Sequence, residues 1–178
     1  VSIIDIGTDP LAPKTLVSLP LMNTIAGPPV NLAITPDEKL AIVANSLNVV
    51  EEGGVMKQVP DNRLWVIDLT TEPPKLIDTV AVGKQPSGLS INRAGTLALV
   101  ANRIAGTVSV LRIDGGQVSV ADTVTVGPAA TGASHAQFTP DGRHALVTRD
   151  NDSTFSVLEI TGNAATKLDR DMTAGVRP

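Results

Sequence analysis

The side chains best suited to acid–base or anion chemistry lie toward the C-terminal end of the chain. His135 precedes a short apolar segment, and Arg149 and Asp150 open the polar run Arg-Asp-Asn-Asp. A neutral imidazole can act as a base near pH 7, and a guanidinium offers a planar fork of donors to a carboxylate or phosphate. The sequence therefore predicts a ligand-binding or acid–base site that contains His135, Arg149 and Asp150. Two plainer interpretations stay open: a channel-lining histidine bonded to water or backbone, and an ordinary polar turn at Arg149–Asp152.

Other kinds of chemistry find no support in the sequence. The chain has no cysteine, so disulfides, thiolate metal ligands and thiol catalysis are excluded. It contains no nucleophile elbow, P-loop or dinucleotide fingerprint. Asp150 and Asp152 have the spacing that opens a calcium loop, but the remaining ligands are missing. We therefore predict neither a metal site nor a cofactor.

Composition and charge exclude several classes of partner. The 178 residues include 18 acidic and 14 basic side chains, a net charge of −4, and 42% are hydrophobic. No apolar run approaches the ~20 residues that a membrane-spanning helix needs. The chain has no Lys/Arg cluster and only one Trp, two Phe and no Tyr, which argues against nucleic-acid binding. We predict a folded domain, or a piece of a larger one, with no membrane span and no nucleic-acid partner.

A repeated unit must position the candidate residues. Three stretches align with one another: Gly27–Asn45, Gly83–Asn102 and Gly127–Arg149. The glycines that open them lie 56 and 44 residues apart, and Gly175 follows after a further 48. A period in the forties, built from short strand-like segments without helical periodicity, is typical of β-propeller blades. The sequence predicts an all-β propeller of four-stranded antiparallel blades.

The repeats predict about three and a half blades. We name the four strands of a blade A to D in chain order. The chain then divides into a half blade (1–26), three blades (27–82, 83–126 and 127–174) and the start of another (175–178). Such a set cannot close a ring and would leave strand edges uncovered. We therefore expect further blades from the rest of a longer chain, and a self-complementing dimer is the less favoured alternative.

The longest connection between strands B and C spans residues 46–62. It contains Glu-Glu-Gly-Gly between apolar pairs, a pattern that predicts a projecting hairpin. Long connections in compact folds are often functional, although a tolerated surface insertion is an equally open interpretation. If it is functional, this segment shapes the channel mouth or contacts a partner.

Strand alternation places the candidate residues on one rim. The D–A links and B–C connections share one end of the blades, here called the mouth rim, and the A–B and C–D turns share the other, the turn rim. Counting back from the A–B turn, we predict Asn31, Ser87 and His135 at one repeat position on the mouth rim, with Arg149 beside them. The turn rim is predicted to carry Asp37, Arg93, Asp141 and His144, and the glycines at 95 and 142 are predicted at positive φ in A–B turns.

The repeated unit resembles the YVTN-type β-propeller repeat family. The resemblance rests on these pieces: Val43-Ala44-Asn45, Thr79–Gly83, Pro86-Ser87-Gly88, Val100-Ala101-Asn102 and Pro140-Asp141-Gly142. The eponymous tyrosine is replaced by Ile42, Leu99 or Leu146, and Thr148-Arg149 stands where the other copies have Ala-Asn. The resemblance implies a seven-bladed propeller. Such relatives include bacterial and archaeal surface and exported proteins, and sugar-lactone hydrolases resembling 6-phosphogluconolactonase, in which Pro-His often stands where this chain has Ser134-His135.

Two functions are consistent with these observations. The favoured one is a non-enzymatic recognition module, periplasmic or on the cell surface as the resemblance implies, that binds a protein or a small anionic or sugar-like ligand at the channel mouth. Its predicted ligand-binding residues are Asn31, Ser87, His135, Arg149 and Asp150. The alternative is a lactone hydrolase in which His135 is the acid/base and Arg149 binds the anion.

Overall fold

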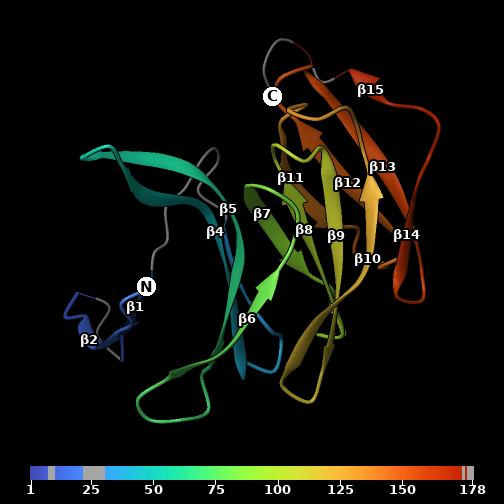
Figure 1. The fold of residues 1–178 in the computed structure, drawn as a ribbon. Coiled ribbons are helices and arrows are strands. Elements are labelled where there is room, and N and C mark those ends of the chain that lie inside the picture. The colour runs from blue at the N-terminus through green and yellow to red at the C-terminus, as the bar shows by residue number, and fades with distance from the viewer. Residues whose placement is uncertain (8–10, 22–30, 174, 176–178) are drawn as a thin grey trace.

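The computed structural model describes residues 1–7, 11–21, 31–173 and 175. In these residues it contains strands and no helix, so the predicted all-β class is confirmed. A two-stranded sheet of β1 (Ser2–Asp5) and β2 (Lys14–Ser18) comes first (Figure 1). Its partly buried Ile3, with Val1 before it and Leu19 after it, packs against the apolar face of β4 and β5. In the described part of the chain no helix is long and apolar enough to span a membrane.

Three larger antiparallel sheets follow in chain order. Blade 1 contains β3 (Leu32–Ile34), β4 (Leu40–Glu52), β5 (Val55–Asp68) and β6 (Lys75–Ala81). Blade 2 contains β7 (Pro86–Ile91), β8 (Leu97–Asn102), β9 (Thr107–Asp114) and β10 (Gln117–Thr125). Blade 3 contains β11 (Ala133–Phe138), β12 (His144–Arg149), β13 (Thr154–Thr161) and β14 (Ala164–Lys167), and the short β15 (Met172–Thr173) also pairs with β13. Each sheet is the A-B-C-D meander of a propeller blade. The predicted start of another blade, 175–178, lies outside the described residues except for Gly175.

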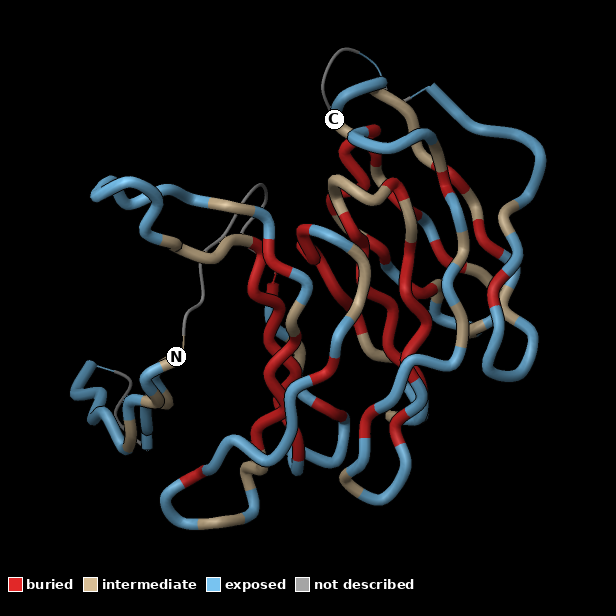
Figure 2. Tube along the Cα trace, viewed as in Figure 1, coloured by how far each residue is buried: buried red, intermediate tan, exposed pale blue. Residues whose placement is uncertain are grey.

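Apolar side chains of neighbouring blades interdigitate. Ile42 and Val66 of blade 1 pack with Leu111 of blade 2, while Leu99 of blade 2 packs with Val147 of blade 3. Strands B and C of blade 2 are therefore buried on both faces, which explains their almost continuous apolar sequences. Figure 2 shows this burial as the red segments along the central strands.

The A–B turns reveal how the three blades align. The side chains of Thr35, Asn92 and Thr139 each accept a hydrogen bond from the backbone N–H of the residue that opens strand B, at 3.0–3.1 Å. These residues therefore occupy one repeat position. Three residues later come Glu38, Gly95 and Gly142, all at positive φ (59°, 72° and 70°). The prediction for the two glycines is confirmed, and Glu38 takes the glycine position in blade 1.

This alignment corrects one prediction from the sequence. The count back from the A–B turn predicts Asn31, Ser87 and His135 at one position when Asn92 is aligned with Pro36 and Pro140. The hydrogen bonds show that Asn92 is instead equivalent to Thr35 and Thr139, because its side chain caps the turn in the same way. Leu32 pairs with Val43, Leu89 with Val100 and Ala136 with Val147, so the residues just before them are equivalent too. The residue in blade 2 that corresponds to Asn31 and His135 is Gly88. Ser87 instead corresponds to Ser134.

Residues 46–62 form a β-hairpin that extends strands β4 and β5. Strands β4 and β5 continue their pairing from Leu47 with Pro60 out to Glu52 with Val55, and Gly53 and Gly54 make the turn at positive φ. The hairpin projects well beyond the rest of blade 1 in Figure 1. The predicted hairpin is confirmed, and it extends from the mouth rim as expected.

Candidate functional site

The mouth rim brings together most of the predicted site residues. Ala133 at the start of β11 pairs with Arg149 at the end of β12, and His135 pairs with Thr148. Asn31 lies at the same end of blade 1, since its carbonyl accepts the N–H of Ala44 at 2.8 Å. His144 opens β12 and therefore lies on the turn rim. The predicted separation of the two histidines is confirmed.

His135 lies where β11 is irregular, because the pairing with β12 shifts between Ala133 and His135. The imidazole is half-buried. Its Nδ1 is fully enclosed and has no hydrogen-bond partner in the described structure, whereas Nε2 is neither enclosed nor hydrogen-bonded there. The two ring nitrogens therefore differ in their surroundings, because only Nδ1 is fully enclosed.

Arg149 is buried, and its guanidinium is occupied by protein groups. Nε donates to the Oγ1 of Thr154 at 2.9 Å, and Nη1 donates to the carbonyl of Val126 and to the Oγ of Ser156 at 3.2 Å. Nη2 forms ion pairs with Asp152 (2.9 Å) and Asp171 (3.0 Å). All nitrogens of the group have partners, so this arginine links the B–C connection of blade 3 to β13 and to the preceding blade. Its role in anion binding stays a prediction.

The carboxylates that pair with Arg149 have altered pKa values. Burial opposes the ionisation of Asp152, but hydrogen bonds from Thr154, Thr131 and Arg149 outweigh it and hold the pKa of Asp152 below its usual value. Asp171 is affected in the same way: burial is opposed by hydrogen bonds and charges from neighbours that include Arg149, and its pKa is lowered. Both groups are therefore anionic at neutral pH and hold Arg149 in place.

Asp150 and Arg103 connect the B–C connections of blades 2 and 3. The Nη1 of Arg103 lies 2.5 Å from the Oδ2 of Asp150, and both side chains are about a quarter exposed. The other carboxylate oxygen of Asp150 is enclosed and has no partner in the described residues. Among the described residues, the Arg103 side chain has a hydrogen bond only to Asp150, and its remaining donors are not enclosed. The Arg103 side chain is also more exposed than that of Arg149 on the same rim.

Asn31 and Ser87 are both buried. The Nδ2 of Asn31 donates to the carbonyl of Ala44 at 3.1 Å, which ties the start of β3 to β4. Ser87 follows Pro86 at the start of β7. Both residues lie on the mouth rim, and whether they contact a ligand stays a prediction.

The sequence analysis missed a second ion pair on the mouth rim. Asp61 is buried and lies 2.5 Å from Arg63, whose guanidinium stacks 5.0 Å from the ring centre of Trp65. Burial opposes the ionisation of Asp61, but hydrogen bonds from Arg63, from a backbone N–H and from Asn45 keep its pKa below the usual value. Arg103 was missed as well. It directly follows Val-Ala-Asn, and that B–C position is the signal that could have identified it.

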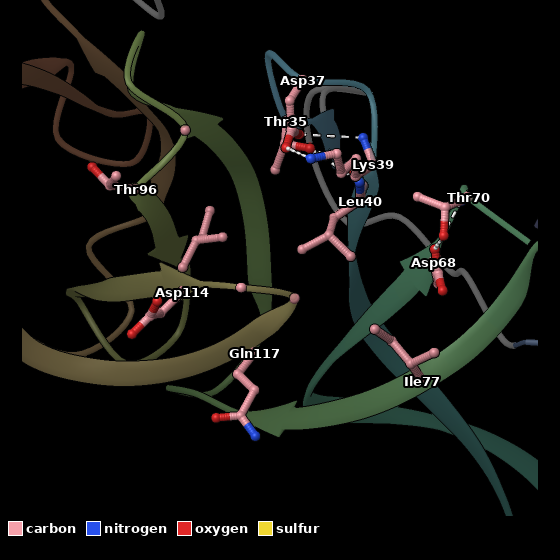
Figure 3. A pocket seen from close by; sticks show the side chains of 14 residues that line it. Thr35, Asp37, Lys39, Leu40, Asp68, Thr70, Ile77, Thr96, Asp114 and Gln117 are labelled. Carbon is pink, nitrogen blue, oxygen red and sulfur yellow. Dashed lines mark hydrogen bonds and ion pairs between the residues drawn. The ribbon is translucent and has the colours of Figure 1, made fainter.

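A cavity of about 640 Å³ opens on the turn rim, between blades 1 and 2 (Figure 3). Its lining includes Thr35, Asp37, Lys39, Leu40, Asp68, Ile77, Thr96, Asp114 and Gln117. The three carboxylates are all engaged in local turn or strand contacts, with Lys39, Thr70 and Arg112 respectively. The cavity lies at the end of the blades opposite His135, and no cluster of three or more His, Asp or Glu side chains in the described residues could hold a metal ion.

Comparison with known proteins supports the fold. No family model matches the chain, and no curated protein matches it. A Bacteroides fragilis protein provisionally assigned as a 6-phosphogluconolactonase is 18% identical with a TM-score of 0.73, over 99% of this chain and 52% of that protein. The periplasmic gluconolactonase PpgL of Pseudomonas aeruginosa is 17% identical with a TM-score of 0.64, over 81% and 40%. The β-propeller domain of Myceliophteria thermophila Cps50 is 12% identical with a TM-score of 0.65, over 96% and 52%.

These similarities have a clear limit. The chain spans about half the length of the structures it resembles. At such low identity the likeness is one of fold, and a fold hosts many activities. No match to the YVTN repeat family is found, so that narrower resemblance stays a prediction. The chain is similar to part of a β-propeller of the kind found in 6-phosphogluconolactonase-like proteins.

Proposed function

We propose that this chain forms the His135-bearing part of the mouth of a sugar-lactone hydrolase. The observation that carries the proposal is the imidazole at the start of an inner strand, with Nδ1 enclosed and Nε2 open on the mouth rim. Two of the compared structures are described as lactonases, which favours this hypothesis over the non-enzymatic recognition module that the sequence favoured. A surface location and a protein partner at the mouth stay predictions.

The chemistry required of His135 is a proton transfer. In lactone hydrolysis, water attacks the carbonyl carbon, and the bond between that carbon and the ring oxygen breaks. An open Nε2 can accept the proton of the attacking water and return it to the departing ring oxygen, which leaves a hydroxy acid. The product acid then releases its own proton to solvent as a carboxylate. His135 has the accessibility for this role.

Arg103 is the better placed residue for an anionic group of the substrate. Arg149 already has a protein partner at every guanidinium nitrogen, whereas Arg103 has one partner, Asp150, and donors that remain open. An arginine held by a carboxylate can still present its free edge to a phosphate or carboxylate. We therefore assign anion contact to Arg103, on the same mouth rim as the acid/base His135.

The chain contains its own control for this proposal. His144 is the other histidine, half-buried on the turn rim away from the mouth. Hydrolysis of a panel of aldonolactones, with and without a phosphate, can be followed by acid release. We expect His135→Gln to lower kcat by about a hundredfold or more, and His144→Gln to leave it unchanged. Equal rates for the two variants, or no hydrolysis by the complete propeller that contains this chain, would overturn the proposal.

A further inference from the structure

We infer that Gly88 is a positioning residue for His135. This inference rests on the proposed function. Because Gly88 has no side chain, the imidazole of His135 can pack against β7 with Nδ1 enclosed, which leaves Nε2 as the nitrogen available to a ligand at the mouth rim. Gly88 itself touches no reacting atom, and it acts through the ring of the neighbouring blade.

The contact between the two inner strands is very close. A Cβ atom added at Gly88 would lie 2.3 Å from the Nδ1 of His135, 2.6 Å from the carbonyl oxygen of Ser134 and 2.8 Å from the Cα of His135. All three separations are shorter than a carbon atom tolerates. The imidazole therefore occupies the space that any side chain on this residue of β7 would need.

Backbone conformation does not explain this glycine. Gly88 is not among the residues with positive φ, so an alanine could adopt its backbone angles without left-handed strain. The equivalent positions in the other blades carry side chains, Asn31 in blade 1 and His135 itself in blade 3. What distinguishes Gly88 is the close approach of β11 in the next blade, which places both its backbone and the imidazole of His135 against this residue.

The packing also decides which nitrogen is available. Nδ1 is covered and has no hydrogen-bond partner in the described residues, so the ring is held by packing and lacks the usual bond from its inner nitrogen to a carbonyl or carboxylate. Nε2 alone remains open. A side chain at Gly88 would push the ring away from β7 and would move Nε2 relative to Arg103 and the substrate.

Gly83 supplies a matched control variant. Gly83 also lies on the mouth rim, and its φ is also outside the positive region. A Cβ added at Gly83 would lie 2.6 Å from the side chain of Asn102. Gly83→Ala thus crowds a side chain on the same rim without touching His135, whereas Gly88→Ala crowds the imidazole and the backbone of β11. The readouts are the ¹⁵N NMR shifts of the two histidines and the kcat and KM for aldonolactone hydrolysis.

We expect Gly88→Ala to shift both nitrogen signals of His135 and leave those of His144 unchanged, with kcat lowered about tenfold or more and KM changed less than about twofold. Gly83→Ala should do neither. Unchanged His135 signals, or shifted signals with an unchanged kcat, would overturn the inference. Shifted His135 signals in a complete propeller that hydrolyses no lactone before mutation would instead overturn the proposed function and keep the packing relationship.

If Gly88→Ala is too unstable for kinetics, its stability in combination with a second substitution still tests the inference. Combining Gly88→Ala with His135→Ala removes the contact with Nδ1 and should restore part of the lost stability, while the contacts with the Ser134 carbonyl oxygen and the His135 Cα remain. A double variant as unstable as Gly88→Ala alone would show that the crowding is against the backbone and that Gly88 does not serve the imidazole.

Discussion

Arg149 occupies in blade 3 the place that Asn102 occupies in blade 2. The two residues end strand B of their blades. Asn102 donates to Thr107 at 3.0 Å and to Ser109 at 2.9 Å, and Arg149 donates to the equivalent Thr154 and Ser156. The arginine replaces the asparagine of the repeat as the group that joins strands B and C. Its longer side chain also forms ion pairs with Asp152 and Asp171.

This relationship predicts the cost of removing Arg149. Arg149→Ala should lower the free energy of unfolding by about 3 kcal/mol, because it leaves Asp152 and Asp171 without their buried partner. Asn102→Ala, which removes a neutral group, should cost about 1–2 kcal/mol. Urea titration measures both. A cost below about 1 kcal/mol for Arg149→Ala would return this guanidinium to the candidates for ligand binding.

Glu38 should be a site where glycine stabilises the fold. It has a φ of 59° at the position where the other two blades have glycine, and left-handed conformations are unfavourable for residues with a Cβ. Glu38→Gly should raise the free energy of unfolding by about 1 kcal/mol.

The reciprocal change at Gly142 tests the same point. Nothing lies within 4 Å of a Cβ added there, so Gly142→Val reports on backbone conformation alone and should cost about 1 kcal/mol or more. If Glu38→Gly is destabilising by a similar amount, the assignment of Glu38 to the glycine position is wrong.

The Asp141 carboxylate should stabilise the fold at neutral pH, and we expect the free energy of unfolding to fall when it is protonated in acid. The side-chain hydrogen bond from Thr139, at 2.6 Å, is the main cause that lowers the pKa of Asp141 from 3.8 to about 2, with Arg143 contributing. A carboxyl with a lowered pKa in the folded state stabilises the fold above its unfolded value, and that contribution is lost as the pH falls toward about 2. Between pH 4 and 2, unfolding midpoints should fall more steeply for the unaltered chain than for Asp141→Asn. Parallel curves would contradict this account of the turn.

Two equivalent leucines in strand B should differ in how well they tolerate a charged substitution. Leu99 is fully buried between blades 2 and 3, whereas the equivalent Leu146 is 42% exposed. Leu99→Lys should prevent folding because it buries an unpaired charge, whereas in a chain with no further blade against blade 3, Leu146→Lys should change the unfolding free energy by less than about 0.5 kcal/mol. Circular dichroism with urea titration distinguishes them. Equal damage from both would mean that blade 3 is covered on both faces.

The sequence was sufficient for the fold because each blade repeats its pattern. Turn residues, small inner strands and continuous apolar strands recur in order, so the three four-stranded sheets and the 46–62 hairpin were predictable. The repeat alignment failed by one residue at Ser87, because Asn92 caps its turn with a side chain unlike that of Thr35 or Thr139. That equivalence appears only once the hydrogen bonds are known.

The site was less predictable because it depends on contacts between blades. His135 could be placed on the mouth rim from strand alternation alone. Nothing in the spacing shows that Gly88 lies against its imidazole, or that Arg149 is satisfied by Asp171 while Arg103 remains open. The contacts of Gly88 and Arg103 arise from the packing of one blade on the next, and Asp171 meets Arg149 only through the fold of blade 3.

The measurement that tests the account most directly is an NMR titration of the isotope-labelled chain with an aldonolactone and with its hydroxy-acid product. The mouth at His135 and the turn-rim cavity of Figure 3 lie at opposite ends of the blades, so the chemical-shift changes identify the site that binds. The account predicts changes centred on His135, Gly88 and Arg103. Changes confined to Asp37, Thr96 and Gln117 around the turn-rim cavity, or no changes at all, would contradict it.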